Sequence, residues 1–125
     1  MTQEDKELLL KDLCARVPYN TRIDGGVEGY IILDAIWYGI IVANIKSGLE
    51  PYLPYLRPMS SITEEEKEEI KPLFSEFTNE FGKRVLVVRQ NKMALYQDWL
   101  NAHHFDYRGL IPKDLALEAP EGMYK

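Results

Sequence analysis

Hydrophobic residues change their spacing at Pro18, and this change restricts the folds open to the chain. Before Pro18, four apolar residues recur at the spacing of an α-helix: Leu9, Leu10, Leu13 and Val17. Thr2 can cap this helix, and Pro18 ends it because the residue before a proline resists the α conformation. After Pro18 the spacing becomes two residues, which indicates β-strands. The sequence therefore predicts an N-terminal helix followed by a sheet.

Three strands are expected between residues 19 and 45. The first ends in the turn Asp24-Gly25-Gly26, where glycines tolerate positive φ. The second covers residues 27–38, and the third covers residues 40–45. Together they predict a three-stranded antiparallel meander with one apolar face on the core. The mixed face carries residues that we expect to be exposed as a protein-partner or homodimer surface: Tyr30, Ile32, Ile36 and Tyr38.

An acidic helix and a further β-rich run are expected in the middle of the chain. Thr63 and Glu66 form a capping box, and an apolar stripe with helical spacing runs over residues 70–81. Pro72 interrupts this stripe, so a kinked helix, or two short helices with Pro72 starting the second, is predicted. Residues 85–88, Val-Leu-Val-Val, are a possible fourth strand whose pairing partner cannot be chosen from the sequence.

The last main helix is expected to start at Asn91, which can cap it, and to end near His104 or Phe105. Beyond it, alternating apolar residues over 115–119 predict a short strand or extended tail. The predicted fold is a single α+β domain over residues 1–125, with helices on one face of its sheet. Its elements are an N-terminal helix, a three-stranded antiparallel meander, a kinked acidic helix, a possible fourth strand, a C-terminal helix and an ordered tail.

Composition and charge narrow the class of protein. Hydrophobic residues make up 46% and charged residues 28%, which is typical of a globular protein. The single Cys14 excludes an internal disulfide and a Cys-rich zinc site, and we expect a small buried residue there rather than a nucleophile. The first residues lack the charge and hydrophobicity of a signal peptide, so a cytoplasmic location is expected. The net charge of −5 arises between Glu64 and Glu80, where seven Glu face two Lys.

The stretch from Asp98 to Ile111 holds the densest group of side chains that could do chemistry. Its adjacent histidines would point about 100° apart on a helix, so they cannot bind one ion together. If the helix end frays, His104 and Asp106 become weak candidates for a metal site, with Asp98 as a third ligand. No cofactor is predicted.

Tyr107 and Arg108 in the same stretch have two interpretations. Arg108 can form a salt bridge with Asp106, or hydrogen bonds to backbone carbonyls, that hold the turn before Gly109. Alternatively, Tyr107 and Arg108 anchor a protein partner from an exposed loop, because these residue types dominate binding hot spots.

A basic run without acidic residues lies between Glu80 and Asp98. Its members are Lys83, Arg84, Arg89 and Lys92. Such a run can bind the phosphates of a nucleic acid. It also fits the solvated edge of a strand, where Lys and Arg oppose aggregation.

Three sequence blocks cover under half of the chain: residues 11–19, 54–63 and 98–125, which open with Lys11-Asp-Leu-Cys, Pro54-Tyr-Leu-Arg and Asp98-Trp-Leu-Asn. Together they resemble a family of short uncharacterised proteins of gut anaerobes, often encoded in prophages and other mobile elements. The resemblance implies an origin and no activity, cofactor or catalytic residue. The family commonly has Gly at the position of Asp114, which would permit a left-handed turn that Asp adopts less readily.

No catalytic constellation is recognisable, so an enzyme is the less favoured class. The sequence favours a non-enzymatic protein-interaction or accessory module of a phage or mobile element. The first alternative is a nucleic-acid-binding protein that uses the run from Lys83 to Lys92. The second is a small metal-dependent enzyme near His104.

Overall fold

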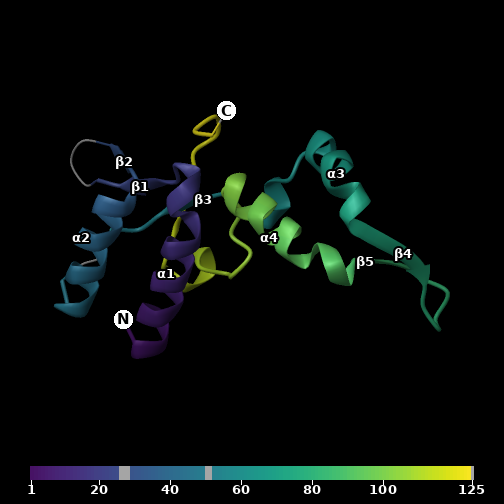
Figure 1. Ribbon diagram of the computed structural model, residues 1–125, viewed down its shortest axis with the longest axis horizontal. Helices are drawn as coiled ribbons and strands as arrows, with labels where there is room; N and C mark the ends of the chain where they lie inside the picture. The colour runs from purple at the N-terminus through teal and green to yellow at the C-terminus, as the bar shows by residue number, and fades with distance from the viewer. Residues whose placement is uncertain (26–28, 50–51, 125) are drawn as a thin grey trace.

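A computed structural model describes residues 1–25, 29–49 and 52–124 of the chain. It is an elongated α+β structure in which four α-helices and three two-stranded sheets are found among the described residues (Figure 1). The α+β class is therefore confirmed. The helices do not cover one face of a single sheet, because the strands are divided among separate pairs.

Helix α1 (Gln3–Arg16) confirms the predicted N-terminal helix. The hydroxyl of Thr2 caps it by accepting a hydrogen bond from the backbone N–H of Asp5 at 3.0 Å. A 3-10 turn, η1 (Val17–Tyr19), follows it. Cys14 is exposed, contrary to the prediction of a buried residue, because it lies about 100° around the helix from Leu13, which faces the core.

The predicted three-stranded meander is wrong. Only two short strands form in this region, β1 (Arg22–Asp24) and β2 (Tyr30–Ile32), which pair antiparallel. The predicted turn at 24–26 lies partly outside the described residues. From Ala35 to Lys46 the chain forms helix α2 instead of a strand.

Helix α2 forms because capping and packing outweigh the β-like composition of this segment. The carboxylate of Asp34 accepts a hydrogen bond from the backbone N–H of Trp37 at 2.8 Å and thereby starts the helix. Ile41 and Ile45, one helical turn apart, are buried against α1 and β1. The segment is apolar on nearly all sides, so its spacing fits a strand as well as a helix.

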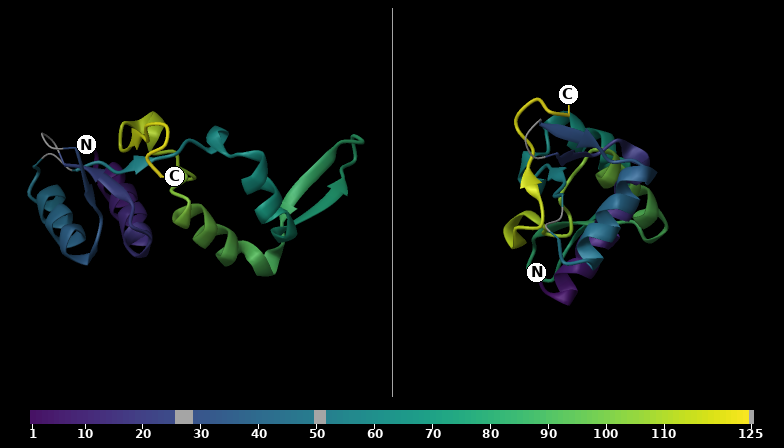
Figure 2. Two further views of the ribbon diagram at one scale, coloured as in Figure 1. Left: turned by 90° about the horizontal axis from the view of Figure 1, so that it is seen from above. Right: turned by 90° about the vertical axis from the view of Figure 1, so that its left-hand side faces the viewer.

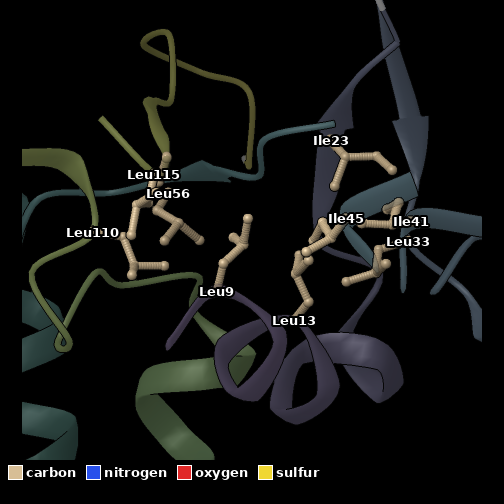
Figure 3. Packing of buried hydrophobic residues seen from close by; sticks show 10 residues of the cluster. Leu9, Leu13, Ile23, Leu33, Ile41, Ile45, Leu56, Leu110 and Leu115 are labelled. Carbon is tan, nitrogen blue, oxygen red and sulfur yellow. The ribbon is translucent and has the colours of Figure 1, made fainter. Parts of the chain in front are cut away.

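One hydrophobic core joins the two ends of the chain (Figure 3). Leu9 and Leu13 of α1 lie at its centre, between residues of β1 and α2 on one side and residues of the C-terminal segment on the other. Its buried members are Leu9, Leu13, Ile23, Leu33, Ile41, Ile45, Leu56, Leu110, Leu115 and Ala116.

The C-terminal tail is ordered because it adds a strand to the middle of the chain. Strand β6 (Leu117–Glu118) pairs parallel with β3 (Tyr55–Leu56), which confirms the extended tail. Before it, the 3-10 turn η5 (Ile111–Lys113) ends at Asp114, whose φ of 58° is left-handed. Asp114 thus adopts the left-handed conformation that Asp takes up less readily than Gly, and Asp is among the non-glycine residues that tolerate it.

The prediction of a kinked acidic helix is correct for its first part and wrong for the residues after Pro72. Helix α3 (Glu64–Ile70) starts with the predicted capping box of Thr63 and Glu66. It ends at Ile70, and Pro72 lies in a 3-10 turn, η3 (Lys71–Leu73). Strand β4 (Phe74–Thr78) follows where a second helical half was predicted, because Pro72 breaks the helical hydrogen bonds and the next residues find a strand partner.

The possible fourth strand is confirmed as β5 (Arg84–Val88), which pairs antiparallel with β4. A short 3-10 turn, η4 (Gln90–Lys92), leads into helix α4 (Met93–Ala102), the predicted last helix. Asn91 does not cap α4, because it lies within η4 and Lys92 takes the cap position without a side-chain bond. The hairpin of β4 and β5, residues 74–88, projects from one end of the molecule and is called the arm below (Figure 2).

Replacing Ile41 by Ala should lower the free energy of unfolding by about 2–5 kcal/mol, because its side chain is fully buried and leaves a cavity. The matched variant Ile36→Ala on the same helix should change it by less than about 0.5 kcal/mol, because Ile36 is 75% exposed. Urea unfolding followed by circular dichroism measures both. Equal losses at the two positions would contradict this placement of α2.

Candidate interaction surface

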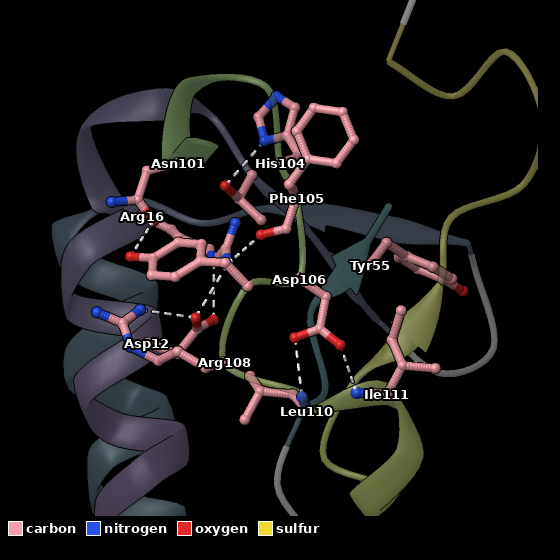
Figure 4. Close-up of polar contacts among 12 residues, drawn as sticks. Asp12, Arg16, Tyr55, Asn101, His104, Phe105, Asp106, Arg108, Leu110 and Ile111 are labelled. Carbon is pink, nitrogen blue, oxygen red and sulfur yellow. Dashed lines mark hydrogen bonds and ion pairs between the residues drawn. The ribbon is translucent and has the colours of Figure 1, made fainter. Parts of the chain in front are cut away.

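A buried ion cluster joins α1 to the C-terminal segment (Figure 4). Arg16 donates hydrogen bonds from Nε and Nη2 to the two carboxylate oxygens of Asp12, at 2.8 and 3.0 Å. Arg108 donates from Nη1 to Asp12 Oδ1 at 2.9 Å. The side chains of Asp12 and Arg16 are fully buried. Two guanidinium groups therefore share one carboxylate inside the protein.

The same cluster holds the turn that follows α4. Arg16 Nη2 donates to the backbone carbonyl of Phe105 at 2.6 Å. Arg16 Nη1 is buried without a hydrogen-bond partner among the described residues, and the guanidinium carbon lies 5.5 Å from the centre of the Tyr107 ring. The Arg108 guanidinium lies 4.6 Å from the same ring. The negative face of the ring attracts both cations and partly replaces water.

Tyr107 and Arg108 are half-buried and make their contacts within the chain. The hydroxyl of Tyr107 donates to Asn101 Oδ1 at 3.0 Å, and Arg108 pairs with Asp12. The salt bridge expected between Asp106 and Arg108 is not formed, because the guanidinium of Arg108 pairs with Asp12, which is distant in sequence. Sequence reasoning missed Asp12, whose only signal was its spacing of one helical turn before Arg16.

His104 and Asp106 do not converge on a common point (Figure 4). His104 Nδ1 lies 3.1 Å from Thr21 Oγ1. The carboxylate of Asp106 accepts hydrogen bonds from the backbone N–H groups of Leu110 and Ile111 at 2.8 and 2.9 Å. Within residues 1–25, 29–49 and 52–124, no group of three or more His, Cys, Asp or Glu is arranged to hold a metal ion. Both side chains serve internal hydrogen bonds instead.

His104 and Tyr124 stack and tie the C-terminal tail to the core. Their ring centres lie 3.7 Å apart, and the Tyr124 hydroxyl donates to Tyr55 O at 2.7 Å while accepting from Arg22 N at 2.9 Å. Burial, reinforced by the positive charge of Arg16, lowers the pKa of His104 to about 4. Burial also raises the pKa of Tyr124 to about 12. His104 is therefore a neutral, structural imidazole near pH 7.

Asp12→Ala should lower the free energy of unfolding by about 3–5 kcal/mol, because it leaves two guanidinium groups facing each other without a carboxylate. Glu7→Ala on the same helix is the matched control and should be nearly neutral, because Glu7 is exposed. Chemical denaturation measures both values. A loss below about 1 kcal/mol for Asp12→Ala would show that the cluster is dispensable.

The stability of the protein should fall as the pH drops from 6.5 towards 4. An unfolded histidine binds a proton below its ordinary pKa of 6.5, whereas native His104 stays neutral until about pH 4. Between pH 7 and 5 this difference removes up to about 2 kcal/mol of unfolding free energy. His104→Asn removes the titration and tolerates the left-handed φ of 64°. Parallel pH profiles for the two proteins would contradict the assignment.

A hollow of about 540 Å³ lies between the start of α3 and the C-terminal tail. Four carboxylates line it: Glu65, Glu66, Glu118 and Glu121. Arg57 donates two hydrogen bonds of 2.7 Å to the carboxylate of Glu66, and these bonds lower the pKa of Glu66 to about 2. His103 Nδ1 lies 3.4 Å from Glu66 Oε2. Glu66 is thus neutralised within the chain, and the other three carboxylates are exposed to water.

The predicted partner surface on the meander is not one sheet face. Tyr30 and Ile32 lie on the outer side of the β1–β2 hairpin and are exposed, with Arg22 beside them. Ile36 is exposed on α2. Tyr38 packs, half-buried, against the hydrophobic core. The four residues are therefore divided between a hairpin and a helix.

The arm exposes four large apolar side chains: Phe77, Phe81, Leu86 and Val87. Phe77, Leu86 and Phe81 are 51%, 65% and 79% exposed. Cross-strand partners share a sheet face, so Phe77 and Val85 lie on the same face as Val87, which is also exposed. Phe74 on the opposite face packs edge-on against Tyr96 of α4, with ring centres 5.1 Å apart. The face of the arm that carries Phe74 is thus anchored at its base. The opposite face, which carries Phe77, Val85 and Val87, is called the open face below.

Sequence reasoning missed this surface because it placed Phe77 and Phe81 on the buried stripe of a helix. The four basic residues of the predicted nucleic-acid site lie in and around β5 and η4. Lys83 precedes β5, Arg84 opens it, Arg89 lies between the two elements and Lys92 ends η4. Arg84 Nε pairs with Glu76 at 2.7 Å, and Arg89 Nε donates to the carbonyl of Phe74 at 3.3 Å. Two of the four cations are therefore engaged within the arm.

Compared with protein-family models, with curated proteins and with solved structures, the chain has no significant match. In the described part of the chain, every helix is too short or too polar to cross a membrane. The geometry of the surface is therefore the basis for a functional proposal.

Proposed function

We propose that the protein is a non-enzymatic interaction module that binds another protein through the open face of its arm. The observation that carries the proposal is the exposure of Phe77, Val87 and Phe81 on a hairpin that projects beyond the helices. Contiguous exposed apolar side chains mark interaction sites in soluble proteins. Aromatic side chains supply most of the area at such sites, because each can bury about 150–250 Å².

The stability of the arm supports this role. A two-stranded hairpin is marginally stable by itself in water, and the arm is held to the body at its base through Phe74 and Tyr96. Its distal half has no hydrophobic cover among the described residues. A partner that covers Phe77 and Val87 would therefore gain apolar contact and also order the arm.

The resemblance to proteins of prophages and mobile elements fits an accessory role of this kind. Small accessory proteins that act by contact need a surface rather than a catalytic site. The buried cluster around Asp12 holds α1 and the C-terminal segment together, and the arm provides the surface for contact.

Nucleic-acid binding through the basic run is the second candidate. Lys83, Arg84, Arg89 and Lys92 follow one another along the chain through β5 and into η4, which favours contact with a backbone of phosphates. The ion pair of Arg84 with Glu76 weighs against it, because binding a phosphate would require breaking that pair or placing Glu76 beside it. A metal-dependent activity near His104 has the least support, since His104 and Asp106 bind groups of their own chain.

Phe77→Ser should abolish capture of a protein partner from extracts of the native host, because it removes the largest apolar side chain of the open face. Ile36→Ser is the matched control, since Ile36 is exposed on α2, far from the arm, and should leave capture unchanged. Quantitative mass spectrometry of tagged variants measures both.

The opposite result, loss with Ile36→Ser alone, would move the interface to α2 and the β1–β2 hairpin. Gel-shift assays at low salt with DNA and RNA test the second candidate in parallel. Binding that is lost on replacing Lys83 and Lys92 by Glu, with no protein captured, would replace the proposal by nucleic-acid recognition.

A further inference from the structure

The backbone N–H and C=O groups of every second residue of β5 point away from β4. Two bonds at the ends of the ladder set the alternation: Arg89 N to Leu73 O at 2.9 Å, and Asn79 N to Lys83 O at 2.8 Å. In an antiparallel pair every second residue bonds across the ladder, and the residues between them face outward. The outward N–H and C=O groups of β5 belong to Arg84, Leu86 and Val88. The sheet has two strands in the described part of the chain, so no third strand covers them.

The outer edge of β4 is obstructed, in contrast to that of β5. The backbone N–H of Phe74 donates to Lys71 O, and its carbonyl accepts from Arg89 Nε at 3.3 Å. Glu76 stands at the middle of this edge. A strand added there would meet occupied backbone groups at one end and a carboxylate at its centre. The edge of β5 has neither obstacle, and its centre is apolar.

We infer that two copies of the chain join through the outer edges of β5, so that two arms form one four-stranded antiparallel sheet. The inference rests on the proposed role of the arm in protein contact and names one partner, a second copy. A twofold axis at Leu86 pairs Leu86 with itself and Arg84 with Val88 of the second copy. All outward groups are then satisfied, because the residues of each pair exchange both backbone hydrogen bonds. A strand edge that complements itself in this way is what an isologous interface requires.

The assembly stops at two copies. After the β5 edges have paired, the remaining edges of the sheet are those of β4. A further symmetric pairing there would place Glu76, which pairs with Arg84 in its own arm, opposite Glu76 of another molecule, and like charges opposite each other destabilise a ladder. The obstructed end at Phe74 also shortens that edge. The charged and shortened β4 edges thus protect the dimer from open-ended aggregation.

The register predicts an unusual dependence on salt. Just outside the ladder, Lys83 comes opposite Arg89 of the second copy, and this repulsion is screened by salt. The backbone hydrogen bonds and the apolar contact of Leu86 and Val88 do not weaken in the same way. Association should therefore strengthen between low and high ionic strength, whereas nucleic-acid binding by the same basic residues would weaken.

Light scattering on the purified full-length chain tests the dimer. A mass of about 29 kDa, twice the 14.5 kDa of the chain, is expected, and a strict monomer at all salt concentrations would overturn the inference. Leu86→Pro removes an outward N–H without removing a bond to β4, so it should weaken association roughly tenfold or more. Leu86→Ala, which keeps that N–H, is the matched control. Circular dichroism verifies that each variant is folded.

Cross-linking locates the edge even if Leu86→Pro does not fold. In a Cys14→Ser background, Leu86→Cys should form a disulfide dimer readily, because the paired Cα atoms would lie about 5.5 Å apart. Glu76→Cys, at the middle of the β4 edge, should not. Equal cross-linking at the two positions, or cross-linking at Glu76→Cys alone, would overturn the inference.

The open face separates this inference from the proposed function. Phe77→Ser should leave the mass near 29 kDa, because its side chain lies on the face and its backbone groups face β5. A monomer that still captures its partner through Phe77 would refute the dimer alone. A dimer that captures no protein would refute the proposed function alone.

Discussion

The carboxylate of Asp12 is the contact on which the arrangement of the chain depends. It binds Arg16 on its own helix and Arg108, which lies 96 residues away in sequence. Buried charges are costly unless they are paired and hydrogen-bonded, and Arg108 and the carbonyl of Phe105 add partners to the Asp12–Arg16 pair of α1. These bonds hold the turn after α4 beside α1. The chain continues from this turn to β6, which pairs with β3.

The polar cluster and the hydrophobic core together divide the molecule into a body and an arm. The body contains both ends of the chain and nearly all of the fully buried apolar side chains (Figure 3). The chain between β3 and Phe105 leaves the body as α3, turns through the arm and returns as α4 (Figure 1). Its contacts with the body include the hydrogen bonds of Arg57 with Glu66 and the stacking of Trp99 on Phe105. Four large apolar side chains, those of Phe77, Phe81, Leu86 and Val87, are exposed on the arm, which the core does not reach.

Several elements could be predicted from the sequence because their signals are local. The hydroxyl of Thr2 and the capping box of Thr63 and Glu66 act on neighbouring backbone groups, so the starts of α1 and α3 follow from a few residues. Strand β5 was predictable because β-branched residues dominate it. The pairing of Arg108 was not predictable, since nothing local distinguishes the nearby Asp106 from the distant Asp12 as its partner.

Local patterns thus determined the α+β class, the first and last helices and the extended tail. Tertiary structure decided the conformation of residues 35–46, whose apolar residues fit both a helix and a strand, and of residues 74–78, where Phe74 and Phe77 have helical spacing but form a strand. A helix forms in the first segment because Ile41 and Ile45 reach the core from α2. A strand forms in the second because β5 is available to pair with it. The exposure of Phe77 follows from that pairing, since a residue assigned to a buried helical stripe becomes open to solvent when the segment turns into a projecting strand.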